Sequence, residues 1–155
     1  MLNKRIVLFA HGSRDARWQM PFNQLTNEMK GRLDSDAVRL AYMEFIPPTI
    51  LDVAGEAVRD GKRELLILPM FLAAGGHLAE DVPAQIDDVR RRFPQLQIEL
   101  LPPIGEHPRV KKVFQEIVCD YAGASKKAEN QIPAADELQT IERKNTEELV
   151  PGSEN

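Results

Sequence analysis

The chain has 155 residues, of which 43% are hydrophobic, and a formal net charge of −4; this is enough for about one domain with an ordinary core. The basic residues are dispersed and no aromatic cluster accompanies them, which argues against a nucleic-acid-binding protein. The single cysteine, Cys119, excludes an intrachain disulfide and a cysteine-based zinc site. No segment resembles a signal peptide or a membrane span, so we expect a cytoplasmic protein that binds no membrane.

Four short apolar runs predict β-strands, and their starts are separated by roughly the length of a βα unit. The first and third contain no polar alternation, which is typical of strands in a parallel sheet covered on both faces. The runs are RIVLFA at 5–10, AVRLAYM at 37–43, ELLILPMF at 64–71 and QIELL at 97–101.

Each predicted strand is followed by a segment in which apolar residues recur at helical spacing, as expected of a helix that packs on a sheet. The sequence therefore predicts an α/β fold, a three-layer αβα sandwich with a four-stranded parallel sheet, (βα)4, and right-handed crossovers. The apolar faces of the expected helices fall within 22–33, 50–58, 78–89 and 110–121.

The composition changes near residue 123. Residues 123–155 hold seven of the 24 acidic and four of the 20 basic residues, and few large apolar ones. Such a segment cannot bury enough surface to fold alone. We expect a domain over 1–122 and an acidic, disordered tail over 123–155; a short helix within this tail that packs on a partner is the alternative.

The loops after the strands carry the residues of chemical interest. His11 follows the first predicted strand, Glu44 the second, His77 the third and His107 the fourth, so all three histidines of the chain fall in these loops. In an open parallel sheet the carboxyl ends of the strands lie at one edge, where ligands bind. We therefore expect these side chains to gather at that edge.

Taken singly, each of these residues also has a structural explanation. His11 fits a half-buried histidine bonded to backbone, Glu44 a solvated loop carboxylate, and His77 and His107 the starts of helices. Together, however, two imidazoles and a carboxylate form a ligand set for a first-row metal ion and can accept protons near neutral pH. The convergence of His11, Glu44 and His77 therefore favours a functional site.

Smaller residues beside these histidines are candidates for binding a substrate. Ala74, Gly75 and Gly76 precede His77 and would let a flat ligand approach the backbone closely. Ser13 and Arg14 follow His11 and could offer a polar contact and a positive charge to an anionic ligand.

Other catalytic motifs are missing from the sequence. There is no G-x-S-x-G nucleophile elbow, no G-x-G-x-x-G after the first strand, and no Walker A spacing of glycines. These gaps argue against an α/β-hydrolase, a dinucleotide-binding enzyme and a P-loop protein.

Three motifs in this order resemble a known family, the small class II tetrapyrrole chelatases, which are sirohydrochlorin cobaltochelatases and ferrochelatases of the CbiX and SirB type. The resemblance covers residues 4–122 and rests on LFAHGSRD, AYMEFIPPTI and LPMFLAAGGHLAEDVP. It implies insertion of Co²⁺ or Fe²⁺ into sirohydrochlorin on the way to cobalamin or sirohaem.

The resemblance also implies roles for individual residues. His11 and His77 match the paired histidines of the family, Glu44 matches its acidic residue, and His107 matches a recurrent G-x-H-P element of no assigned role. No cofactor is implied beyond the metal substrate, with Ni²⁺ as a third candidate, and a single copy of the domain implies a homodimer. Two rivals stay open, a non-catalytic carrier of metal or tetrapyrrole and a flavodoxin-like scaffold.

Metal insertion requires that the two pyrrolic protons leave while the ion sheds its water. We expect His11 and His77 to hold the ion, at least one of them to accept a proton, and Glu44 to complete the site or relay the proton. Because neutral imidazole serves both roles, the sequence predicts that activity falls below roughly pH 6.5.

Overall fold

The computed structural model describes residues 3–33, 36–73, 75 and 78–123. The chain divides into two compact units, Met1–Phe114 and Gln115–Asn155. The second unit contains, within the described range, only the end of the last helix and the turn that follows it. The sheet and the loops after its strands belong to the first unit.

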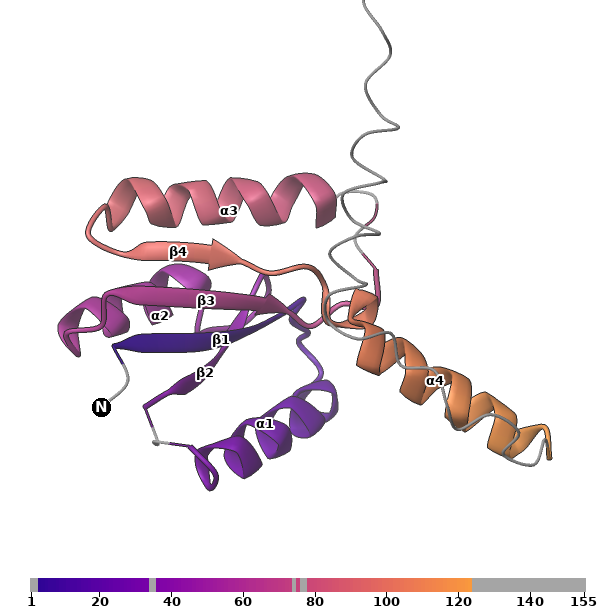
Figure 1. Cartoon of the computed structure of the whole chain (residues 1–155). Helices are drawn as coiled ribbons and strands as arrows, with labels where there is room; N and C mark the ends of the chain where they lie inside the picture. The colour runs from indigo at the N-terminus through magenta and orange to yellow at the C-terminus, as the bar shows by residue number, and fades with distance from the viewer. Residues whose placement is uncertain (1–2, 34–35, 74, 76–77, 124–155) are drawn as a thin grey trace, which may run out of the picture. The chain divides into compact units, whose positions relative to one another are not determined.

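Strands and helices alternate along the chain (Figure 1). The four strands are β1 (Lys4–Ala10), β2 (Val38–Tyr42), β3 (Glu64–Pro69) and β4 (Gln97–Leu100). The helices are α1 (Ala16–Lys30), α2 (Ile50–Arg59), α3 (Leu78–Arg92) and α4 (Pro108–Tyr121), with a short 3₁₀ turn, η1 (Ile104–Glu106), before α4.

The strands form one sheet in the order β2-β1-β3-β4, and every pairing is parallel. Ile6 of β1 lies opposite Val38 of β2 and Leu66 of β3, which fixes the register of the three strands. All four strands therefore end at one edge of the sheet, where the loops that follow them begin (Figure 1). The predicted α/β fold with a four-stranded parallel sheet is confirmed.

The two faces of the sheet are covered by different helices, because successive side chains of a strand point to opposite faces. Val7 and Phe9 of β1 belong to a core shared with α2 and α3, and Leu8 and Ala10 to a second core beside α1. Figure 1 shows α1 and α3 on opposite sides of the sheet.

Two of the predicted helical faces differ from the structure. The chain turns at Gly31, whose N–H bonds to the carbonyl of Asn27, so α1 ends at Lys30 and Leu33 lies beyond it, 44% exposed. Helix α4 buries none of its side chains, although its apolar spacing predicts packing; the boundary between the two units falls within this helix, after Phe114.

A buried arginine links the start of β1 to the end of α2 and to the residues before β2. Arg5 of β1 is fully buried, and its Nη2 lies 2.6 Å from Oδ2 of Asp60, the residue that ends α2. Its Nε donates to the carbonyl of Asp36. The hydrogen bond from Arg5 lowers the pKa of Asp60, so this carboxylate stays ionised opposite the buried cation. The pair joins β1 to the far end of α2.

This pair predicts a pH dependence of stability. Because the folded state lowers the pKa of Asp60, its contribution is complete above the unfolded value of about 3.9 and is lost as the pH falls from there through the folded pKa. We expect Asp60→Asn to unfold at lower urea concentration than wild type at pH 7, and the difference to shrink below about pH 4. A difference that stays constant between pH 6 and pH 3 would contradict this reading.

Candidate functional site

His11 and Glu44 lie in direct contact at the carboxyl edge of the sheet. His11 follows the last residue of β1 and Glu44 lies two residues after β2. The Nε2 atom of His11 is 3.0 Å from Oε1 of Glu44, and both side chains are partly exposed, at 35% and 41%. The predicted meeting of these two residues is thus present, and the pair remains open to a ligand.

Main-chain hydrogen bonds hold the two loops together beyond the ends of the strands. The N–H of Met43 donates to the carbonyl of Ala10, and the N–H of Glu44 donates to the carbonyl of His11, at 2.9 and 3.0 Å. The backbone therefore continues the pairing of β1 with β2 for two more residues and places His11 beside Glu44.

Gly12 makes this approach possible, and the sequence analysis did not single it out. Its φ is 101°, a conformation that L side chains rarely adopt, and a Cβ at this position would overlap the carbonyl oxygen of Glu44. The signal that could have revealed it is the glycine directly after His11, at the point where two loops must meet.

Both ring nitrogens of His11 face hydrogen-bond acceptors. Nε2 faces the Glu44 carboxylate, and Nδ1 lies 3.2 Å from the carbonyl oxygen of Gly12. A protonated ring can donate to both at once, whereas a neutral ring donates to one of them. The Glu44 carboxylate is thus placed to accept a hydrogen bond from an N–H at Nε2.

The same pair has the spacing of two ligands of one metal ion. A nitrogen and an oxygen that each lie about 2.1 Å from an ion, at right angles, are about 3.0 Å apart. The distance between Nε2 of His11 and Oε1 of Glu44 is 3.0 Å. An imidazole and a carboxylate in adjacent coordination positions suit first-row divalent ions.

The remaining members of the predicted site are described only in part. Ala74, Gly76 and His77 lie outside the described residues. Gly75 is exposed, and a Cβ there would meet no atom within 4 Å. Among the described residues no group of three potential metal ligands occurs. His11 and Glu44 therefore form the part of the predicted set that the structure brings together.

Arg14, which precedes α1, and Arg17, in the first turn of α1, have different partners. Arg17 donates to both carboxylate oxygens of Asp15, the residue that caps α1, and these bonds lower the pKa of Asp15. Ser13 accepts a hydrogen bond from the N–H of Asp15. Arg14, in contrast, forms no ion pair with any described residue, and its guanidinium lies 5.5 Å from the centre of the Phe45 ring. Of these two arginines, Arg14 is thus the one whose charge no described residue pairs.

His107 serves the start of α4. Its Nδ1 accepts a hydrogen bond from the N–H of Arg109 at 3.2 Å, in the first turn of that helix. Such a bond satisfies one of the free N–H groups of a helix N-terminus. The structural explanation of His107 is therefore confirmed.

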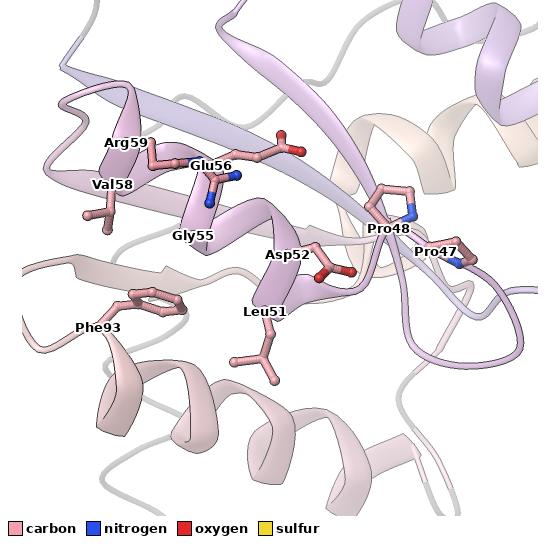
Figure 2. A pocket seen from close by; sticks show the side chains of 9 residues that line it. All are labelled: Pro47, Pro48, Leu51, Asp52, Gly55, Glu56, Val58, Arg59 and Phe93. Carbon is pink, nitrogen blue, oxygen red and sulfur yellow. The ribbon is translucent and has the colours of Figure 1, made fainter.

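The structure has a groove along α2 whose lining residues do not include this pair (Figure 2). It runs from Pro47 and Pro48 to Phe93, at the end of α3. Its acidic side chains are already engaged, since Asp52 caps α2 by bonding to Thr49 and Glu56 lies 3.7 Å from Arg39. The groove contains neither His11 nor Glu44, so its shape does not mark the site.

None of the described helices is both long and apolar enough to cross a membrane.

Comparison with known proteins gives the chain its family. The CbiX family model matches residues 5–121. The chain is 27% identical over 113 residues to a sirohydrochlorin cobaltochelatase of Sulfurisphaera tokodaii, and the match covers 73% of this chain and 89% of that protein. It is also 26% identical over 102 residues to a chloroplastic sirohydrochlorin ferrochelatase of Arabidopsis thaliana, covering 66% of this chain and 45% of that protein.

A solved structure agrees with these matches. The crystal structure of a CbiX protein of Marinobacter aquaeolei VT8 superposes with a TM-score of 0.68 at 32% identity and covers 80% of this chain and 98% of that one. The family match runs from Arg5 of β1 to the end of α4 and includes both His11 and Glu44. The chain therefore belongs to the CbiX family.

Proposed function

We propose that the chain is a sirohydrochlorin chelatase, a lyase that inserts Co²⁺ or Fe²⁺ into the metal-free macrocycle in the biosynthesis of cobalamin or sirohaem. The contact between His11 Nε2 and Glu44 Oε1 carries this proposal, because it joins a metal ligand to a proton acceptor in one open site. The names of the relatives, cobaltochelatase and ferrochelatase, support it.

In the proposed chemistry, one group of side chains holds the metal ion and also accepts a pyrrolic proton. His11, Glu44 and His77 hold the incoming ion. As the ion passes from these side chains to the pyrrole nitrogens, a ring nitrogen of His11 or His77 that it has left accepts a pyrrolic proton. The 3.0 Å contact of Nε2 with Oε1 gives a proton on His11 a direct path to the partly exposed Glu44, and from there to water. The metal is a substrate here.

Residues around this group are proposed to bind the macrocycle. Arg14 offers its charge to a carboxylate at the rim of the ring, since it has no competing ion pair among the described residues. We expect the small residues before α3 to leave space for the flat face of the macrocycle. The proposed substrate-binding residues are Ser13, Arg14, Ala74, Gly75 and Gly76.

The identity of the metal is left open by the donors, because imidazole and carboxylate accept cobalt, iron and nickel alike. We keep Co²⁺ and Fe²⁺ as the proposed ions and Ni²⁺ as the third. Insertion rates measured with each ion under the same conditions separate them.

The proposed domain extends over residues 1–122, which agrees with a family match over 5–121. We further propose a homodimer, as the resemblance to the family implies for a chain that carries a single copy of the domain. Sedimentation at micromolar concentration tests this, and a monomer over the working range would contradict it.

The decisive test of the function is direct. The protein is mixed anaerobically with metal-free sirohydrochlorin and Co²⁺ or Fe²⁺, and the change in the absorption spectrum is followed against the rate without protein. We expect insertion well above the spontaneous rate. A protein that binds the macrocycle but does not exceed that rate is a carrier, and the chelatase proposal would then be wrong.

A further inference from the structure

Phe45 lies next to Glu44 in an unusual backbone conformation. Its φ is 70°, the only positive value among the described non-glycine residues, and the N–H of Ile46 bonds to the carbonyl of Glu44 across it at 2.9 Å. Phe45 is thus the central residue of a three-residue γ-turn of the rare, strained kind. Strained residues of this type persist where the surrounding structure demands them, and they concentrate at functional sites.

The ring of Phe45 lies near two charged or ionisable groups. Its centre lies 6.1 Å from the centre of the His11 ring at an angle of 44°, and the Arg14 guanidinium carbon lies 5.5 Å from it. The second distance is within the range of a cation–π interaction. This phenyl group, which is 53% exposed, therefore lies close to both the imidazole of the site and the guanidinium of Arg14.

Contact with an aromatic face leaves the hydrogen-bonding capacity of an arginine intact. The N–H donors of a guanidinium lie in its plane, at the rim, and remain available to a carboxylate when the flat face rests on a ring. The side chain loses rotamer freedom in that contact, so less is lost when the carboxylate arrives. Phe45 can thus orient Arg14 without competing for its ligand.

We propose that Phe45 is a positioning residue, which sets the place of Arg14 relative to His11 so that the carboxylated rim of the macrocycle is anchored while its centre lies at the metal site. This inference rests on the proposed function and adds to it a residue that contacts neither the ion nor the transferred proton. It predicts that Phe45 acts on substrate binding, through Arg14.

A double-mutant cycle tests the coupling. KM and kcat for metal-free sirohydrochlorin are measured at saturating Co²⁺ for wild type, Phe45→Ala, Arg14→Ala and the double variant. We expect Phe45→Ala to raise KM by about 2–5-fold, the size of an exposed cation–π contact, and Arg14→Ala to raise KM by at least as much, with kcat within about twofold in both. The double variant should be no worse than Arg14→Ala alone. The proposal would be overturned if the increase in KM of the double variant equalled the product of the two single increases. It would also be overturned if Phe45→Ala left KM unchanged.

Further variants separate positioning from folding. Phe45→Tyr keeps the aromatic face and should restore the wild-type KM. Phe45→Gly removes the unfavourable φ, so its urea midpoint should equal or exceed that of wild type while KM rises as in Phe45→Ala. A purely structural role of Phe45 predicts instead that stability and KM worsen together. Met20→Ala, at a 66% exposed position of α1, is the matched control for loss of a surface apolar group.

Titration with metal-free sirohydrochlorin in the absence of metal distinguishes a failure of this inference from a failure of the proposed function. If wild type binds sirohydrochlorin but inserts no metal, the proposed chelatase function is wrong. The Kd values of the same variants for sirohydrochlorin then still test the role of Phe45. Equal Kd values for wild type and Phe45→Ala overturn the inference alone. A wild type that does not bind overturns both.

Discussion

A His11→Ala variant is expected to insert metal at least about 100-fold more slowly than wild type, because removal of a positioned acid–base group costs about 10²–10⁴ in rate. The fold should be retained, since the His11 side chain is 35% exposed and the neighbouring loops are joined by main-chain bonds that alanine preserves. Initial insertion rates and urea unfolding of the same preparation measure both effects.

His107→Asn is the matched control for this variant. It also removes an imidazole from a loop after a strand, but asparagine can still accept the N–H at the start of α4. Its rate should stay within about twofold of wild type. A His11→Ala variant that is equally active would remove His11 from the chemistry, and with it the observation on which the proposed function depends.

Replacing Gly12 with alanine should damage the fold and the activity together. The new Cβ would overlap the carbonyl oxygen of Glu44, and alanine is strained at a φ of 101°. Backbone strain and a forced shift of packed atoms together cost roughly 2–5 kcal/mol. The loops can relieve the overlap only by separating, which would break the contact between His11 and Glu44.

Gly31→Ala provides the comparison for Gly12→Ala. Gly31 ends α1 with a φ of −71°, and an added Cβ would meet its nearest neighbour at 3.4 Å, so stability and insertion rate should change little. Urea unfolding gives the free energies of unfolding, and the assay above gives the rates. If Gly12→Ala has the wild-type free energy of unfolding and insertion rate, the loops can adopt another backbone conformation and this prediction is wrong.

Most of the architecture could be predicted because it follows from periodicity. The unbroken apolar run at β1 and the helical spacing in 50–58 depend only on neighbours along the chain, and both elements form where expected. The ends of α1 and the exposure of α4 were not predicted. Apolar spacing identifies a face but does not say where the backbone turns or what covers that face.

In the site, too, some features could be predicted from the sequence and others could not. Topology alone brought His11 and Glu44 to one edge, and they are in contact. The overlap that Gly12 avoids, the γ-turn at Phe45 and the different roles of Arg14 and Arg17 depend on contacts between loops or on local hydrogen bonds. No pattern along the chain encodes those contacts. Gly12 and Phe45 were therefore not singled out from the sequence, and Arg14 was a candidate there without its contact to Phe45.

The two hydrogen bonds that extend the pairing of β1 with β2 have an evolutionary consequence. Because main-chain atoms set the separation of His11 and Glu44, changes of side chain elsewhere in α1 and α2 can accumulate without altering it. The arrangement requires two adjacent parallel strands and a glycine after the histidine, and little else. It could therefore persist while most of the surrounding sequence diverges, and it could be transplanted to another parallel sheet by exchanging two short loops.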